Sequence, residues 1–536
     1  MNRETPLSLN HLLERAGRLY PESELVTRLP DKSLTRMTFA DFHRRSRAFA
    51  AALKQAGLNK GDRVATLCWN HHVHLECYFG IPAAGGVMHT LNLRLGAEEL
   101  AWIMNHAEDR ILIVDDVLLP LYEAVRDKVN LERVIVFPYS GAPVADEFTD
   151  YEQFIADAPE AFEYVPHDEN DPVAMCYTSG TTGRPKGVVY SHRSTVLHTL
   201  TACLPETWCL RSDDSVLPVT PMFHANSWGM PYACVMLGLK MIFPGPHLHP
   251  EDLLDLFEAE QPTYSLGVPS IWLPMVELLD TQRERWNLPK KMRMLVGGSA
   301  MPEAAIRKFA AHGYEVTHGW GMTETSPLAS AASVKPELQH LSEEERFPLY
   351  ATAGIIQPLV DIRIVGDEGE QPWDGKSTGE IQVHGPFITN SYYNAPEATE
   401  KFTDDGWLRT GDVATIDPHG YIRIVDRTKD LIKSGGEWIS SVDMENALIA
   451  HPDVAEAAVI AIPHPKWTER PLACIVTRSG VDRIDENELR DLLLERFAKW
   501  QLPDAFIFMD ELPHTSTGKL SKLTLRQMHT DGKLAS

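Results

Sequence analysis

The chain has 536 residues, of which 43% are hydrophobic and 23% are charged, and its formal net charge is −25. These proportions are typical of a soluble globular protein and exclude a disordered or fibrous chain. The length suggests three or four structural units at about 150 residues each. The negative charge argues against general nucleic-acid binding, which needs a basic face.

Cysteine usage and apolar runs indicate the compartment. The seven cysteines form no Cys-x-x-Cys pair and are odd in number, which predicts neither a zinc site nor a disulfide framework. The N-terminus has no apolar stretch typical of a signal peptide. The longest apolar run, 228–239, is shorter than the roughly 20 residues of a membrane span. We therefore expect a cytoplasmic protein with no transmembrane segment and at most peripheral membrane contact.

Helix and strand patterns alternate through the first 300 residues. Thr38 is expected to cap a helix that ends at Gly57. Further helices are expected at 98–106, 118–128 and 250–260. Strands are expected at 62–68, 111–114, 133–137, 173–177, 215–221, 240–243, 264–268 and 293–297. This alternation predicts an α/β fold whose large N-terminal lobe has two α/β layers with parallel strands.

The pattern changes in the last third of the chain. Short strands with frequent Gly, Pro and Asp predict a small β subdomain at about 353–425. The charged stretch 426–430 suggests a boundary. Beyond it, helices at 442–450 and 486–497 and strands at 456–462 and 505–509 predict a small α+β unit. The expected domains are therefore 1–425 and 431–536, joined by 426–430.

The most informative segment is 178–187, Thr-Ser-Gly-Thr-Thr-Gly-Arg-Pro-Lys-Gly, directly after an expected strand. Its glycines let the backbone approach a polyanion, its amides and hydroxyls can donate to phosphate oxygens, and Lys186 supplies positive charge. It is not a Walker A loop, because Gly187 stands where that motif needs Ser or Thr. A flexible linker could have the same composition, but it has no need of a preceding strand. The segment predicts a phosphate-binding loop.

Two more glycine-rich segments lie further along the chain. The first directly follows the expected strand 293–297, at the end of the strand where open α/β proteins bind ligands. The first, 297–302, is weak on its own, because any tight turn uses glycine. In the second, 319–325, Trp320 could stack on a base and Glu324 could hold a hard cation. A turn with a packed tryptophan is an equally good interpretation.

Two later residues are also ambiguous alone. Asp412, expected on a loop after Gly411, could accept the hydroxyls of a ribose or could be a turn aspartate. Lys519, at the end of Thr-Ser-Thr-Gly-Lys, could meet a carboxylate and a phosphate together or could be a surface lysine.

The order and spacing of these motifs resemble the adenylate-forming superfamily of acyl-CoA synthetases, adenylation domains and luciferases, over essentially the whole chain. The segments 221–228, 426–430 and 435–440 look like the medium- and long-chain fatty acyl-CoA synthetase branch. The resemblance implies an ATP-dependent acid–thiol ligase. A carboxylic acid, expected to be a medium- or long-chain fatty acid, attacks the α-phosphate of ATP to give acyl-AMP and pyrophosphate. The thiol of coenzyme A then displaces AMP.

Other readings remain open at this point. The acid could be short or functionalised, of aryl, branched or methylthio-propionate type. The chain could be a nonenzymatic nucleotide sensor, although a sensor needs no catalytic lysine. A luciferase-like oxygenase or an amide-forming ligase is a third option, and whether coenzyme A accelerates AMP release distinguishes it. The family also suggests Mg²⁺ as cofactor and a homodimer.

The resemblance assigns roles residue by residue. The catalytic residues would be Lys519, Glu324 and Thr181, and the last two would bind Mg²⁺. ATP and AMP would be bound by Thr178, Ser179, Gly180, Thr182, Gly183, Lys186, Gly298, Ser299, Ala300, Gly319, Trp320, Gly321, Met322, Thr323, Asp412 and Arg427. The acyl pocket would include His224, Asn226, Trp228 and Gly298. Coenzyme A would meet Lys433, Gly435, Gly436, Glu437 and Trp438.

Two further features follow from the family. Lys429 falls at the hinge about which the small C-terminal domain swings between the two half-reactions. The family usually carries tyrosine at the position of Trp320, so stacking on adenine is retained here while the tyrosine hydroxyl is lost.

Overall fold

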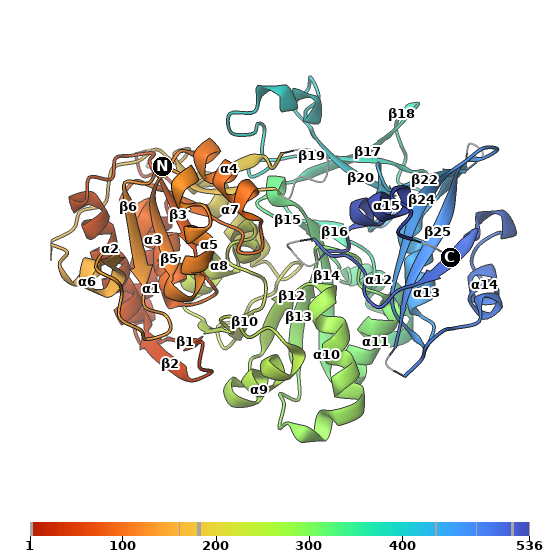
Figure 1. The fold of residues 1–536 in the computed structure, drawn as a ribbon, viewed down its shortest axis with the longest axis horizontal. Helices are drawn as coiled ribbons and strands as arrows, with labels where there is room; N and C mark the ends of the chain where they lie inside the picture. Colours follow the sequence, from red (N-terminus) through yellow and green to blue (C-terminus); the bar gives the residue numbers. More distant parts are fainter. Residues whose placement is uncertain are drawn as a thin grey trace.

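A computed structural model of the chain describes residues 4–159, 161–178, 184–434, 437–478, 480–515 and 519–534. Within these residues there are four β-sheets together with α-helices, so the predicted α/β class is confirmed. In Figure 1 the red and orange N-terminal elements lie on the left, the green central elements in the middle and the blue C-terminal elements on the right. None of the described helices is long and apolar enough to cross a membrane.

The first sheet has seven strands and is mainly parallel. Its order is β7 (Thr149–Asp150), β6 (Arg133–Phe137), β5 (Asp109–Asp115), β3 (Arg63–Leu67), β4 (Val87–Thr90), β8 (Pro172–Tyr177) and β9 (Gly187–Ser191). Because β8 and β9 are antiparallel neighbours, the expected phosphate loop leaves and re-enters the sheet at the same end.

Besides α5 (Leu119–Glu123), six helices accompany this sheet. They are α1 (Leu9–Leu19), α2 (Phe39–Gln55), α3 (His72–Ala83), α4 (Ala97–Ala107), α6 (Tyr151–Ala156) and α7 (His192–Ala202). The prediction for α2 is confirmed, since the hydroxyl of its N-cap Thr38 accepts a hydrogen bond from the backbone N–H of Asp41.

The expected helix at 118–128 is wrong in extent. Only α5 (Leu119–Glu123) is α-helical, and short 3₁₀ turns flank it at Asp116–Leu118 and Arg126–Lys128. Val125 interrupts the helix with φ −121° and ψ −7°. Its side chain is 1% exposed, so burial of this β-branched residue takes precedence over continued helical geometry.

The second sheet is the other predicted α/β layer, and it has nine strands. Its order is β16 (Ile355–Ile356), β15 (Leu328–Ala331), β14 (Tyr314–Gly321), β13 (Met292–Val296), β12 (Tyr264–Gly267), β10 (Ser215–Pro218), β11 (Lys240–Phe243), β1 (Glu24–Arg28) and β2 (Leu34–Thr38). Strands β14 to β1 of this order are parallel. The hairpin β1–β2, which sequence reasoning missed, completes the edge beside β11.

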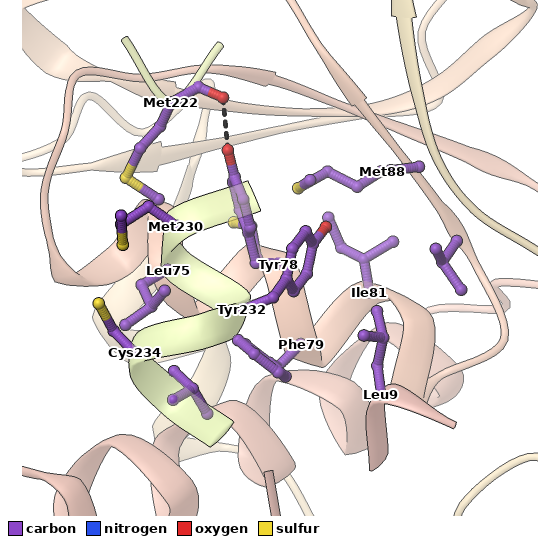
Figure 2. Packing of buried hydrophobic residues seen from close by; sticks show 14 of the residues in the cluster. Leu9, Leu75, Tyr78, Phe79, Ile81, Met88, Met222, Met230, Tyr232 and Cys234 are labelled. Carbon is purple, nitrogen blue, oxygen red and sulfur yellow. Dashed lines mark hydrogen bonds between the residues drawn. The ribbon is translucent and has the colours of Figure 1, made fainter. Parts of the chain in front are cut away.

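The helices of this layer are α8 (Met230–Leu237), α9 (Pro250–Glu260), α10 (Pro269–Gln282), α11 (Glu303–Ala311) and α12 (Glu343–Tyr350). Figure 2 shows α8 packed against α3, with the ring of Tyr232 5.2 Å from that of Tyr78 and 5.7 Å from that of Phe79. The hydroxyl of Tyr78 donates to the carbonyl of Met222. The segment that leads to the expected acyl pocket is therefore fixed to the core.

The third sheet is the predicted small β subdomain. Its antiparallel order is β18 (Gly369–Glu370), β17 (Asp361–Gly366), β19 (Gly379–His384), β20 (Leu408–Ile416) and β21 (Ile422–Arg427). The expected loop position of Asp412 is wrong, because this residue lies within β20 opposite Arg427 of β21. Gly411, with φ 77°, takes the unusual backbone conformation within the strand.

The fourth sheet belongs to the C-terminal part of the chain. Its strands are β23 (Glu437–Ile439), β22 (Ile432–Ser434), β25 (Thr468–Thr477) and β24 (Val454–His464), with β26 (Ala505–Phe508) paired to β25. The helices α13 (Ser441–Ile449), α14 (Glu486–Leu494) and α15 (Lys522–Thr530) complete this unit. The mixed sheet with helices fits the predicted small α+β fold.

Candidate active site

The turn after β13 meets a lysine from the C-terminal unit. Gly298 has φ 83°, and a Cβ there would lie 3.3 Å from Cε of Lys519 and 3.2 Å from Cγ1 of Val268. Both the backbone conformation and the close approach of Lys519 therefore favour glycine. Ser299 and Ala300 continue this turn. The two parts of the chain thus touch at the residue that sequence analysis selected as the catalytic lysine.

Asp412 is buried and accepts hydrogen bonds from two side chains. Trp320 donates from Nε1 to Oδ2 at 2.8 Å, and Arg427 donates from Nε to Oδ1 at 3.1 Å. Asp412 is 5% exposed, and its charge is the main cause that raises the pKa of Arg427. Sequence reasoning missed the bond from Trp320. The indole N–H, not only the ring plane, is the useful feature of this tryptophan.

Charged groups from four segments converge around Lys519. The pKa of Lys519 is lowered to about 8, mainly by burial and also by the positive charge of Arg427, while the negative charges of Asp412 and Glu324 act in the opposite direction. His224 lies in the same region. Burial lowers the pKa of His224 to about 3, and the positive charge of Lys519 adds to the effect. This histidine is therefore neutral at physiological pH.

Glu324 lies on a 3₁₀ turn, Thr323–Thr325, at the end of β14. It is 6% exposed, and burial raises its pKa. Tyr392 donates its hydroxyl to Oε1 of Glu324 at 2.7 Å. A buried carboxylate of this kind fits Mg²⁺, which prefers oxygen ligands and would offset the buried negative charge. The other expected ligand, Thr181, lies outside the described residues.

The two ends of the expected phosphate loop are joined. The backbone N–H of Thr178 donates to the carbonyl of Lys186 at 2.9 Å, and the N–H of Lys186 donates to Oγ1 of Thr178 at 3.2 Å. Nζ of Lys186 lies 5.3 Å from the ring centre of Tyr392. The loop residues Ser179, Gly180, Thr181, Thr182 and Gly183 are outside the described part of the chain.

The expected acyl-pocket segment has an unusual backbone. Ala225, Asn226, Ser227 and Trp228 have φ values of 43°, 53°, 49° and 58°. Each left-handed residue of this kind costs about 1–2 kcal/mol. Hydrogen bonds hold the turn: Ser227 and Thr220 share one at 2.7 Å, and Asn226 accepts one from the thiol of Cys176 at 3.3 Å. Such strain persists where the surroundings fix it, and it clusters at functional sites.

Trp228 lies between this turn and the glycine-rich turn at 297–302. Its side chain is 8% exposed. A Cβ on Gly297 would lie 3.4 Å from Cη2 of Trp228. The indole therefore lies directly beside the turn that Lys519 approaches, which places the expected acyl pocket next to the expected reaction centre.

The expected coenzyme A residues lie elsewhere. Nζ of Lys433 is 5.1 Å from the ring of Trp438, and Trp438 is 50% exposed. Among the residues that the structure describes, no hydrogen bond or ion pair joins either of them to Lys519. Gly435, Gly436 and the side chain of Glu437 lie outside the part of the chain that the structure describes. Among the described residues, Gly298, Glu324, Asp412, Arg427 and Lys519 are thus brought together, whereas Lys433 and Trp438 contact each other and make no hydrogen bond or ion pair with Lys519.

Further contacts link the C-terminal unit to the N-terminal lobe. Arg478, which follows β25, forms an ion pair with Glu277 of α10. Asp426 accepts a hydrogen bond from the backbone N–H of Ser441 at 2.8 Å. The expected hinge residue Lys429 is exposed. Neither Glu277 nor Arg478 belongs to a motif, so nothing in the sequence indicated this pair.

The family comparisons agree with this geometry. Residues 13–393 match the family described as AMP-binding enzyme, and residues 443–519 match its AMP-binding enzyme C-terminal domain. The chain therefore belongs to the AMP-binding enzyme family. The resemblance to adenylate-forming enzymes is confirmed.

Individual relatives narrow the class. The chain is 48% identical over 526 residues to a long-chain-fatty-acid–CoA ligase of Thermus thermophilus, covering 98% of this chain and 96% of that one. It is 41% identical over 534 residues to a 3-methylmercaptopropionyl-CoA ligase of Ruegeria lacuscaerulensis, covering 98% of both. The crystal structure of ATP-bound MatB from Rhodopseudomonas palustris aligns with a TM-score of 0.82 at 27% identity, over 98% of this chain and 99% of that one. The predicted enzyme class, an AMP-forming acid–thiol ligase, is confirmed.

Proposed function

We propose that the enzyme activates a medium- or long-chain fatty acid to acyl-AMP with release of pyrophosphate, and then transfers the acyl group to coenzyme A. The observation that carries this proposal is the close approach of the Lys519 side chain to Gly298, at a position where the charges of Asp412 and Glu324 act on it. Similarity to the long-chain ligase of Thermus thermophilus supports the choice of acid. A cytoplasmic location and a homodimer stay predictions.

Each charged residue has its own proposed role in adenylation. Protonated Lys519 would neutralise charge where the acid's carboxylate meets the α-phosphate, which is electrostatic catalysis by a preorganised cation. Each oxygen of Asp412 has a second lone pair beyond the bond it accepts, so both can receive a ribose hydroxyl. Lys186 would bind the triphosphate oxygens.

Glu324 and Thr181 would hold Mg²⁺, which supplies charge neutralisation on the phosphates when it is bound. The burial of Glu324 suits this role, because the carboxylate then has little water to compete with the ion.

The second half-reaction needs a different arrangement of the C-terminal unit. Lys519 approaches Gly298, while Lys433 and Trp438 are exposed. We therefore propose that rotation about 426–430, with Lys429 as the hinge residue, moves the loop 435–438 toward the acyl-adenylate. Closures of this kind commonly complete a catalytic site.

The ion pair between Glu277 and Arg478 should favour the adenylation arrangement. Glu277→Arg is expected to slow acyl-adenylate formation by up to about fivefold, because a partly exposed pair is worth roughly 0.2–1 kcal/mol. Thioester formation from supplied acyl-AMP should be unchanged or faster. The exchanged pair, Glu277→Arg with Arg478→Glu, should restore the rate. Equal losses in both half-reactions, or no restoration, would contradict this role.

Adenylation should decline in alkaline solution. Lys519 acts in its protonated form, and its pKa is lowered to about 8, so kcat/KM for ATP should fall as the pH rises through this value. Lys519→Arg keeps its charge over this range. The variant should be slower at neutral pH but should lack the decline. A wild-type profile that stays flat to about pH 9.5, or the same decline in both proteins, would refute the assignment.

Release of AMP from acids of two to 18 carbons and from aromatic acids, with and without coenzyme A, tests the proposed function. We expect fatty acids to give the highest kcat/KM, with neighbouring chain lengths differing by at most about fourfold, because one buried methylene is worth about 0.8 kcal/mol. Coenzyme A should accelerate AMP release.

The similarity to the 3-methylmercaptopropionyl-CoA ligase supports one alternative, a short functionalised acid. A marked preference for thioether-substituted or branched propionates in the same assay would favour it. AMP release that coenzyme A does not accelerate would instead indicate an amide-forming or oxygenase activity. No AMP with any acid would contradict a ligase of either kind.

A further inference from the structure

Tyr392 contacts both charged residues expected to handle the triphosphate. Its hydroxyl donates to Oε1 of Glu324 at 2.7 Å, and Nζ of Lys186 lies 5.3 Å from its ring centre. We propose that Tyr392 is a positioning residue that sets the arrangement of Lys186 and Glu324 for the triphosphate and its metal ion. This inference rests on the proposed function and assigns a role outside the phosphate loop and the other motifs.

The backbone around Tyr392 fixes the same two regions. The N–H of Thr389 donates to the carbonyl of Glu324 at 2.8 Å. The N–H of Tyr393 donates to the carbonyl of Gly187 at 2.8 Å, and these two residues form an isolated β-bridge. The segment 389–393 thus joins the start of β9, directly after Lys186, to the turn that carries Glu324. It acts as a brace between them.

The side chain of Tyr392 is held in place within this brace. It is 9% exposed, and its ring lies 5.8 Å from that of Phe402. A hydrogen bond to a carboxylate and a cation above an aromatic ring are both favourable contacts for tyrosine. Leucine at this position would provide neither contact, and phenylalanine would provide only the second.

The two charges meet different parts of Tyr392, Lys186 the ring and Glu324 the hydroxyl. Among the ion pairs of the described residues, Lys186 and Glu324 are not partners. A direct pair between them would neutralise both groups and so weaken the attraction of Lys186 for phosphate and of Glu324 for a dication. Tyr392 instead contacts each charge through a different part of its side chain, which leaves both available for the ligand.

Two substitutions separate these contacts. Tyr392→Phe removes the hydroxyl and keeps the ring, whereas Tyr392→Leu removes both. Tyr393→Phe is the matched control, because the hydroxyl of Tyr393 points to the exposed residue Glu108 at 3.5 Å and its bridge to Gly187 uses the backbone alone. Thermal unfolding and circular dichroism of each variant verify folding. If Tyr392→Leu fails to fold, Tyr392→Phe still provides the test.

Electron paramagnetic resonance can monitor the binding of Mn²⁺ together with ATP. Because no acid is present, this experiment measures metal positioning without turnover. Mn²⁺ is a suitable probe because it shares the oxygen-ligand preference of Mg²⁺. Tyr392→Phe should weaken Mn²⁺–ATP binding about tenfold, as expected when a hydrogen bond to a charged group is lost. Tyr392→Leu should weaken it further. AMP binding should be unchanged in both variants.

The half-reactions provide the second readout. In Tyr392→Phe the KM for ATP should rise and adenylation should slow, whereas the KM for the acid and the thioester step from supplied acyl-AMP should stay within twofold of wild type. The inference would be overturned if Tyr392→Phe kept both Mn²⁺–ATP binding and the KM for ATP within twofold of wild type. Equal losses in Tyr393→Phe would overturn it as well. Wild-type protein that forms no AMP with any acid would instead contradict the proposed function.

Discussion

Lys519→Ala is expected to slow acyl-adenylate formation by at least roughly 10²- to 10³-fold, the usual effect of removing one preorganised electrostatic group. The structure brings the side chain of Lys519 against Gly298, where a Cβ would lie 3.3 Å from its Cε. Alanine cannot supply the positive charge at this position. The measurement is the rate of acyl-AMP formation in a single turnover with ATP and acid.

The control for Lys519→Ala is the other half-reaction. Supplied acyl-AMP and coenzyme A should give acyl-CoA at a rate within a few-fold of wild type, because this step needs the C-terminal unit in another orientation. Lys519→Arg should retain more adenylation than Lys519→Ala, since it keeps the charge with altered geometry. Near wild-type adenylation by Lys519→Ala would show that the lysine has no catalytic role.

Asp412→Asn is expected to impair both half-reactions, by roughly 10- to 100-fold, because the nucleoside is bound in each of them. The carboxylate accepts from Trp320 at 2.8 Å and from Arg427 at 3.1 Å. An amide of the same shape presents an N–H to one of these donors and leaves it unpaired, which costs about 1–3 kcal/mol when the group is buried. The free energy of unfolding should fall by a similar amount.

Asp405→Asn is the matched control for Asp412→Asn. Asp405 lies in the same β subdomain and pairs with Arg363, but its side chain is 59% exposed, so its loss should change stability and both rates very little. The KM for ATP and for acyl-AMP, together with urea unfolding, distinguishes the two variants. A thioester step unaffected by Asp412→Asn would contradict the assignment of Asp412 to the nucleoside.

Sequence patterns predicted those elements whose signals are local. The Thr38 cap and the amphipathic run behind it are contained within 38–55, and α2 formed as expected. The helix at 118–128 failed because Val125 is buried by tertiary contacts that no local pattern encodes. The strand β1 was missed for the same kind of reason, since its parallel partner β11 lies more than 200 residues away.

In the candidate site, too, local motifs could be predicted from the sequence and contacts between distant residues could not. Glycines and charged residues in motifs identified Gly298, Glu324, Asp412 and Lys519, and the first and last of these meet directly. The contacts between motifs could not be predicted. Trp320 reaches Asp412 across 92 residues, and a resemblance that assigns the aromatic ring to adenine says nothing about its N–H. Tyr392 lies outside the segments that the sequence analysis selected, so only the fold connects it to Glu324.

Exchange of labelled pyrophosphate into ATP, measured without coenzyme A, is the most direct test of the central claim. The wild-type protein should catalyse exchange only when a carboxylic acid is present, because pyrophosphate must attack a bound acyl-adenylate to reform ATP. Lys519→Ala should slow this exchange by at least roughly 10²- to 10³-fold. Exchange that is independent of acid, or acid-dependent consumption of ATP that yields ADP and phosphate, would contradict an adenylating ligase built around Lys519.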